Sequence, residues 1–264
     1  MTTYSRAFST LGCPELSLDD ALALAQSHGL AAIELRTLSG TIDLPALFAR
    51  EFVTPAALAV HVARQSVQIV SLDTSFKLAE PSEAEWEAFL AFVPWAEARG
   101  VKWLRVFDGG APGRPLEPLL ATLARWRAHR ASNGIGADMM IETHDSLFTA
   151  AAINAFAQAA SGAAILWDTH HTWKKGGEDP VATWNAIKPH VVHVHVKDSI
   201  SRPSARHPFT YVLPGAGEFP MAPLRAALAG EFRGTVSLEW ERQWHPYLPP
   251  LEDALRAGAE RKWW

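Results

Sequence analysis

The feature that most constrains the fold of this chain is a regular alternation of short apolar segments and helix-like segments. Eight apolar segments have strand character, and their starts are mostly about 25 to 36 residues apart, the length of one β-loop-α-loop unit. They cover residues 6–10, 31–35, 67–72, 101–107, 137–142, 163–168, 191–196 and 235–239. Eight such units in succession predict an α/β fold, a single (β/α)8 TIM barrel that spans residues 1–264 as one domain.

The ends of the helix-like segments carry the expected signals. Ser17 precedes an acidic first turn in the pattern of a capping box, and Gly29 follows the same segment as a stop signal. Ser82 opens another helix in the same way. Pro94 lies inside that helix, and we expect it to kink the helix because proline removes one backbone hydrogen bond.

One connection is much longer than the others. Residues 198–220, between the seventh strand and the helix that follows, are polar and rich in Pro, Gly and Arg. Loops of this length in a compact domain are usually functional or mobile. We therefore expect this loop to cover the barrel mouth and to be less ordered than the strands. Arg202, Arg206 and His207 within it are interpreted as a solvated face, with a substrate lid as the alternative.

Composition excludes several classes of protein. The chain has 264 residues, 48% of them hydrophobic, with a net charge of −4, which disfavours a nucleic acid partner. Cys13 is the single cysteine, so no internal disulfide can form, and a reducing, cytoplasmic location is expected. No signal region and no run long enough for a membrane span is recognised. A homo-oligomer is left open.

Four of the expected strands end in residues with metal-ligand chemistry. They are Met-Ile-Glu-Thr-His (140–144), Leu-Trp-Asp-Thr-His-His (166–171), Val-His-Val-His-Val-Lys-Asp (192–198) and Ser-Leu-Glu-Trp-Glu (237–241). The carboxyl ends of the strands in a closed parallel barrel converge on one mouth. The sequence therefore predicts a cluster of acidic and imidazole side chains at that mouth.

If the last residue of each strand faces the barrel axis, four residues from successive strands form a half-ring of ligands. They are Glu142, Asp168, His195 and Glu239. Three carboxylates and one imidazole suit a single divalent ion, with Mn²⁺ favoured and Mg²⁺, Co²⁺ or Zn²⁺ as alternatives. A different register would select His193 or Glu241. Asp168 has a second reading as the cap of the following turn.

Further polar residues near the strand ends are candidates for binding a small sugar or polyol. They are His144, His171, Lys197, Arg36 and Arg105. The two arginines could bind a polyol or an acid group, and a salt bridge within the barrel is the alternative for at least one of them. Lys197 could contact substrate, or pair with Asp198 or a glutamate. His170 is expected to face outward.

Four tryptophans flank these motifs, at positions 167, 173, 240 and 244. Large aromatic side chains in such places form either ordinary core or the apolar wall of a ligand pocket. The sequence leaves these two readings open.

Taken together, the ordered set Glu-x-His, Trp-Asp-x-x-His, His-Val-His-x-Lys-Asp and Leu-Glu-Trp-Glu resembles the xylose-isomerase-like barrel superfamily, and most of all its sugar phosphate isomerase/epimerase branch. The likeness covers nearly the whole chain. The ketose 3-epimerases of that family bind one divalent metal through residues that match Glu142, Asp168, His195 and Glu239. The resemblance implies that the two glutamates also act as proton acceptor and donor, and that His171 contacts a substrate oxygen.

The physical chemistry of a proton next to a carbonyl supports such roles. A metal that chelates the carbonyl stabilises an enediolate, and a carboxylate within reach can take the proton. Return of the proton to the other face gives an epimer, whereas return to the adjacent carbon gives an isomer. A divalent-metal-dependent sugar or sugar phosphate isomerase or epimerase is therefore the function that the sequence favours.

Three other functions compete with this interpretation. An inosose-type dehydratase would use the same scaffold and metal. An apurinic-endonuclease-like phosphoesterase resembles the chain at Glu142 and Asp168-x-x-His171, but it needs histidines on earlier strands, where this chain has Asp73 and Asp108. A barrel that binds sugar without turnover is the third.

Overall fold

The computed structural model describes residues 3–264, and it shows a closed barrel of eight parallel strands. Around the barrel the order is β1-β10-β7-β6-β5-β4-β3-β2. The strands are β1 (Ser5–Ser9), β2 (Ala32–Leu35), β3 (Gln68–Lys77), β4 (Trp103–Phe107), β5 (Asp138–Glu142), β6 (Ala164–Asp168), β7 (Val191–Val196) and β10 (Thr235–Leu238). The predicted (β/α)8 barrel is confirmed, since β1 closes it by pairing with β10.

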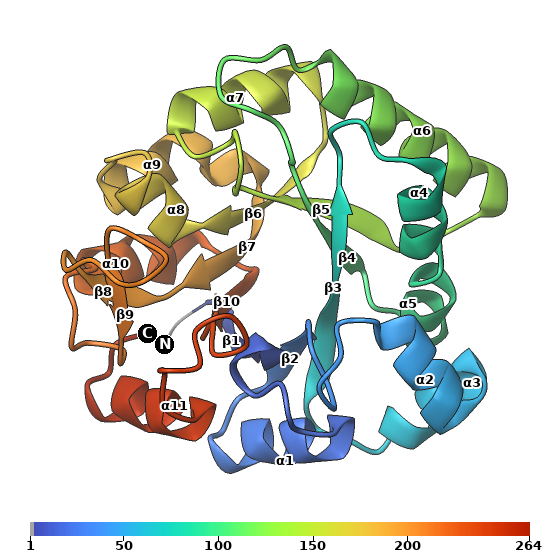
Figure 1. Ribbon diagram of the computed structural model, residues 1–264, viewed down its shortest axis with the longest axis horizontal. Coiled ribbons are helices and arrows are strands. Elements are labelled where there is room, and N and C mark those ends of the chain that lie inside the picture. The colour runs from blue at the N-terminus through green and yellow to red at the C-terminus, as the bar shows by residue number, and fades with distance from the viewer. Residues whose placement is uncertain (1–2) are drawn as a thin grey trace.

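Helices surround the strands in an outer ring (Figure 1). They are α1 (Leu18–Ser27), α2 (Leu44–Phe52), α3 (Pro55–Val62), α4 (Glu83–Leu90), α5 (Val93–Arg99), α6 (Glu117–Asn133), α7 (Ala150–Ala159), α8 (Thr169–Lys174), α9 (Pro180–Ile187), α10 (Met221–Glu231) and α11 (Leu251–Glu260). Two short 3-10 helices, η1 (Thr10–Gly12) and η2 (Lys188–His190), lie beside β1 and β7.

The predicted helix starts are present. The Ser17 hydroxyl accepts the Asp20 N–H at 3.2 Å, and Ser82 forms a complete capping box with Glu85. Gly29, just beyond α1, has a φ of +64°, which glycine adopts without steric cost. These caps satisfy backbone groups that a helix end would otherwise leave without partners.

Two elements differ from the prediction. The helix expected to kink at Pro94 is instead two helices, α4 and α5, and Pro94 occupies the first turn of α5, where its missing N–H costs nothing. The short helix α8 starts directly after β6 and was not predicted. It is only six residues long, which is too short to show a helical periodicity in the sequence.

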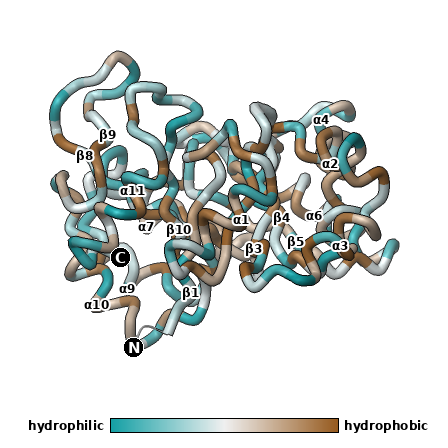
Figure 2. Tube along the Cα trace, turned by 90° about the horizontal axis from the view of Figure 1, so that it is seen from below, coloured by the Kyte–Doolittle hydropathy of each residue, from teal (hydrophilic) through white to brown (hydrophobic). Residues whose placement is uncertain are grey.

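The long loop after β7 contains a two-stranded antiparallel hairpin, β8 (Asp198–Ile200) and β9 (Thr210–Val212). Asp198 organises its base, because its carboxylate accepts the backbone N–H groups of Gly215, Gly217 and Phe219 at 2.8–3.1 Å. In Figure 2 this hairpin projects from the end of the barrel opposite to the N-terminus. The loop therefore stands over the carboxyl ends of the strands.

The core fills the space between strands and helices. Aromatic side chains are prominent there, and Trp167 of β6 stacks on Trp184 of α9 with ring centroids 6.1 Å apart. Among residues 3–264, no helix has the length and apolar character that crossing a membrane would require.

Candidate metal centre

The four side chains that the sequence placed in a half-ring do converge. Each of them offers one ligand atom, and these atoms all lie within 4.8 Å of one another. They are Glu142, Asp168, His195 and Glu239, and all four are buried. Strand register explains the meeting, because Asp168 of β6 lies directly opposite His195 of β7. Glu239 follows β10, and its N–H donates to the carbonyl of Val196 at 3.1 Å.

The two carboxylate oxygens of Asp168 make different contacts. Oδ1 accepts the N–H groups of His170 and His171, at 2.9 and 3.0 Å, and so caps α8. Oδ2 turns toward the cluster and lies 2.7 Å from Nζ of Lys197. The two readings of this residue, ligand and turn cap, are therefore compatible, and the cap fixes the direction of the free oxygen.

Glu34 of β2 orients His195. Its carboxylate lies 2.9 Å from Nε2 of His195 and 2.7 Å from Nε2 of His193. Burial raises the pKa of Glu34, but both imidazoles outweigh that effect and hold it well below its usual range. An ionised carboxylate only accepts hydrogen bonds, so Nε2 of His195 carries the proton and Nδ1 faces the cluster.

His193 lies outside the four-residue cluster and contacts Glu34, and Glu34, His193 and His195 form a second group of side chains that could hold a metal ion. Nδ1 of His195 lies 3.4 Å from Oε2 of Glu239. Burial disfavours a charged imidazole, yet Glu34 and Glu239 together raise the pKa of His195 well above its usual value. The carboxylates thus stabilise positive charge at this point of the barrel.

Lys197 is buried among three carboxylates. Its ammonium contacts Asp168 and Glu239, and it lies 2.6 Å from Oε1 of Glu241. Burial lowers the pKa of Lys197, but these three acids outweigh burial and raise it well above its usual value. Of the partners considered from the sequence, the glutamates are therefore the ones present, whereas Asp198 binds the loop backbone.

Arg105 of β4 forms the ion pair that the sequence allowed for one of the arginines. Its Nε lies 3.3 Å from Oε2 of Glu142, and its Nη2 lies 3.9 Å from Oδ2 of Asp73. Burial nevertheless raises the pKa of Glu142 to about 7 and that of Asp73 to about 6. For both carboxylates, the destabilisation of the negative charge by burial is therefore larger than its stabilisation by Arg105.

The donor set fits a divalent cation. Oε2 of Glu142, Oδ2 of Asp168 and Nδ1 of His195 are buried and make no aligned hydrogen bond to any other part of residues 3–264. Glu142 and Asp168 have only ion-pair contacts at these oxygens, with Arg105 and Lys197, and one ligand atom from each of the four residues lies within a single small volume. Three carboxylates with one imidazole match Mn²⁺, Mg²⁺, Co²⁺ or Zn²⁺.

A cavity of about 370 Å³ opens beside the cluster at the carboxyl ends of the strands. All the predicted substrate contacts line it, namely Arg36, Arg105, His144, His171 and Lys197. So do Glu142, Glu239 and Glu241. The rest of the wall consists of the apolar or aromatic residues Leu11, Phe107, Phe209, Tyr211 and Trp244, together with Lys175 and His207. The cavity therefore combines a candidate metal centre, cationic groups and an aromatic wall, which suits a small polar ligand.

One expectation about this region was wrong, and the structure decides between the two readings that the sequence left open for the tryptophans. His170 does not face outward: it is buried, and its Nε2 lies 2.8 Å from the Ser199 hydroxyl beneath the hairpin. Of the four tryptophans that flank the motifs, Trp244 lines the cavity, whereas Trp167 and Trp240 are core residues. Trp173 packs against Phe219 and is absent from the cavity wall.

The hairpin contributes more than a solvated surface. His207, Phe209 and Tyr211 all line the cavity, and the Tyr211 hydroxyl donates to Glu241 at 2.9 Å. Sequence reasoning named His207 only as an alternative and missed the two aromatic residues. Their alternation along Phe-Thr-Tyr is the signal of a strand with one buried face.

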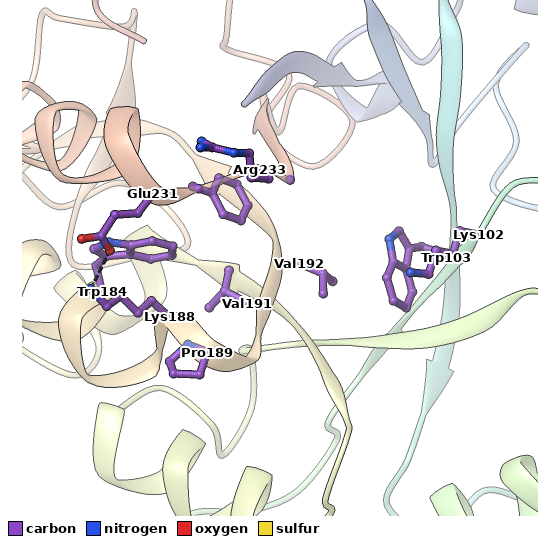
Figure 3. Close-up of a pocket in the computed structure, with 11 residues that line it drawn as sticks. Lys102, Trp103, Trp184, Lys188, Pro189, Val191, Val192, Glu231 and Arg233 are labelled. Atoms are coloured by element: carbon purple, nitrogen blue, oxygen red, sulfur yellow. Dashed lines mark hydrogen bonds and ion pairs between the residues drawn. The ribbon is translucent and has the colours of Figure 1, made fainter. Parts of the chain in front are cut away.

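A second pocket, of about 440 Å³, lies at the opposite end of the barrel, near the starts of β4 and β7 (Figure 3). Trp103, Trp184 and the ion pair between Lys188 and Glu231, at 2.5 Å, line it. None of the four cluster residues reaches this pocket. In TIM barrels active sites lie at the carboxyl ends of the strands, so the first cavity is the functional candidate.

Residues 22–264 match the family model described as the xylose isomerase-like TIM barrel. The match covers most of the chain, so the protein belongs to this family. No curated protein sequence matches the chain.

Several solved structures share the fold. A probable 3-DHS dehydratase, AsbF, involved in petrobactin synthesis in Bacillus anthracis, is 18% identical with a TM-score of 0.78, and 97% of each chain is covered. The IOLI protein with a bound zinc atom is 16% identical with a TM-score of 0.71, over 98% of this chain and 96% of that one. A D-tagatose 3-epimerase-like protein is 14% identical with a TM-score of 0.68, over 98% and 96%. At these identities the likeness establishes the fold.

Proposed function

We propose that this protein is a divalent-metal-dependent sugar isomerase or epimerase that moves a proton between a carbon next to a carbonyl and the two glutamates Glu142 and Glu239. The observation that carries the proposal is that both glutamates belong to the converging ligand set and also line the cavity. Two carboxylates that reach one bound substrate from different strands can remove a proton and return it at a different place.

Each residue of the centre has a defined part in this proposal. Glu142, Asp168, His195 and Glu239 would hold the ion, which when bound would polarise the substrate carbonyl as a Lewis acid. Glu142 or Glu239 takes the proton, and the other returns it. Lys197 keeps its proton and donates a hydrogen bond to the developing enediolate oxygen, where a fixed positive charge is most useful. The aromatic wall excludes water from the reacting carbon.

A second candidate, dehydration on the same scaffold, is favoured by one specific observation. Lys197 lines the cavity as a buried ammonium. An ammonium in this position can donate a proton to a hydroxyl group that leaves from the carbon beyond the enediolate. The structural likeness to a probable 3-DHS dehydratase is consistent with this chemistry.

The test is a panel of ketoses, aldoses and inososes incubated with the Mn²⁺-loaded protein in deuterated water. An isomerase or epimerase incorporates deuterium next to the carbonyl and yields a product of unchanged mass apart from the label. A dehydratase instead yields a lasting ultraviolet absorbance from a conjugated product. Absence of both signals, with metal bound, would rule out proton transfer for the substrates in the panel.

The glutamates are tested on any substrate so found. Glu142→Gln and Glu239→Gln should each lower deuterium exchange by about 10²–10⁴-fold, because one general base contributes that much. Saturating Mn²⁺ separates a lost base from a weakened metal site. Glu97→Gln is the matched control, because Glu97 is exposed and accepts two backbone N–H groups away from the centre. Near-normal exchange in both glutamine variants would show that another residue is the base.

A further inference from the structure

Arg36 is a buried cation of the cavity wall without an anionic partner. It follows β2, where the Thr10 hydroxyl accepts its backbone N–H at 2.8 Å, and its side chain is 5% exposed within the fold. The guanidinium donates to the hydroxyl of Ser75 at 2.8 Å and to the backbone carbonyl of Asp73 at 3.4 Å. Within residues 3–264 no carboxylate lies within ion-pair distance of it; the acids paired with arginine in this region pair with Arg105.

The other buried cations of the same cavity are paired. Arg105 lies beside Glu142 and Asp73, and Lys197 lies between three carboxylates. Burying a charge without a counter-charge strongly destabilises a fold, so packing alone does not account for an unpaired buried guanidinium. Burial, followed by repulsion from Arg105, lowers the pKa of Arg36 to about 10, which leaves it charged at neutral pH.

We propose that Arg36 binds a carboxylate of the substrate, so that the substrate is a polyhydroxylated carboxylic acid with a carbonyl group rather than a neutral sugar. The part of this inference that concerns the reaction rests on the proposed function, whereas the part that concerns carboxylate binding does not. Arg36 and two residues of the ligand cluster, Glu142 and Glu239, line one cavity of about 370 Å³, so a single small molecule can reach both. Leu11, Phe107 and Trp244 line the same space and can pack against its carbon skeleton.

The geometry favours a carboxylate over a phosphate. A guanidinium has five N–H donors in a planar fork, and Arg36 uses one on each of two nitrogens, which leaves donors free for a planar two-oxygen group. A phosphate monoester carries a charge of about −2 at neutral pH and usually needs several cations or backbone N–H groups. Lys197 and Arg105, the other buried cations of the wall, are already engaged by acids, and Lys175, which is exposed, donates to the backbone carbonyl of His144 at 3.1 Å.

Binding, measured without turnover, is the first test. Titration calorimetry on the full Mn²⁺-loaded chain would use matched sets: hexuronates, the corresponding hexoses and the hexose 6-phosphates. At least one hexuronate should bind about 10-fold or more tightly than its hexose, because one hydrogen-bonded charge pair is worth that much. Arg36→Met should remove this advantage, because it weakens hexuronate binding much more than hexose binding. Arg36→Lys, which keeps the charge but loses the fork, should retain part of it.

Arg64→Met is the matched control, since Arg64 is exposed and the substitution removes the same charge elsewhere. Circular dichroism and a thermal melt report whether Arg36→Met folds. If Arg36→Met does not fold, the comparison is made with Arg36→Lys. The proposal is overturned if no hexuronate binds better than its hexose, if the phosphates bind best, or if the selectivity survives both Arg36 variants. Selective acid binding without any deuterium exchange would instead support the inference and count against the proposed reaction.

Discussion

Replacement of Glu34 by Gln is the most informative perturbation of the candidate metal centre. Glu34 is not one of the four cluster residues, yet its carboxylate lies 2.9 Å from Nε2 of His195 and 2.7 Å from Nε2 of His193. An amide keeps the volume but carries no charge and replaces one carboxylate oxygen by an NH2 donor, so it cannot offer each imidazole N–H its own acceptor oxygen as the carboxylate does. His195 then loses the contact that fixes Nε2–H and presents Nδ1 to the cluster.

The expected effect is on metal affinity. Loss of an outer partner of a histidine ligand typically costs about 10- to 100-fold in affinity, which corresponds to about 1.4–2.7 kcal/mol. Competition with a chelator for Mn²⁺ would measure the dissociation constant of wild type, Glu34→Gln and the exposed control Glu97→Gln. The fold is checked by circular dichroism. Wild-type affinity in a folded Glu34→Gln protein would refute the idea that this carboxylate orients the ligand.

Three further outcomes follow from single contacts. Lys197→Met should destabilise the metal-free protein by about 3–5 kcal/mol in a denaturant titration, because it leaves three buried carboxylates without their cation, and added Mn²⁺ should restore part of the loss. An unchanged midpoint would contradict the buried pairing. Trp167→Ala should lower the free energy of unfolding by about 3–5 kcal/mol, because Trp167 is fully buried. Trp244 is 37% exposed, so Trp244→Ala should change the free energy of unfolding by less than about 1 kcal/mol. Equal effects would contradict the assignment of Trp167 to the core and Trp244 to the cavity wall. Asp198→Ala should speed hydrogen exchange in residues 199–219 but not in the barrel strands, and unchanged exchange would mean that other contacts hold the hairpin.

The barrel and the convergence of the four side chains could be predicted from the sequence because both depend on local order. Apolar strands buried on both sides read as continuous runs, and the residue at the end of each run must emerge at the barrel mouth. Glu142 and Asp168 could therefore be placed together although 26 positions separate them in the chain. His195 was preferred to His193 for the same reason, since it lies nearer to the end of its strand.

What the sequence did not reveal depends on contacts between distant segments. Glu34 meets His195 across the barrel interior, from a strand that is not adjacent to β7, and no local pattern marks that meeting. His170 was expected to face solvent because no residue near it in the sequence indicates the hairpin. Phe209 and Tyr211 of that segment pack against its ring. The unpaired state of Arg36 likewise appears only when every carboxylate around it has been placed.

The most direct test of the central claim is anomalous diffraction from a crystal of the protein soaked in Mn²⁺. The arrangement of Glu142, Asp168, His195 and Glu239 predicts one strong anomalous peak within bonding distance of all four side chains. Nδ1 of His195 should be the nitrogen that faces the peak, with Nε2 retained by Glu34. A peak bound instead by Glu34 and His193 would contradict this arrangement. So would a protein that binds one equivalent of Mn²⁺ in solution but shows no peak at the four residues.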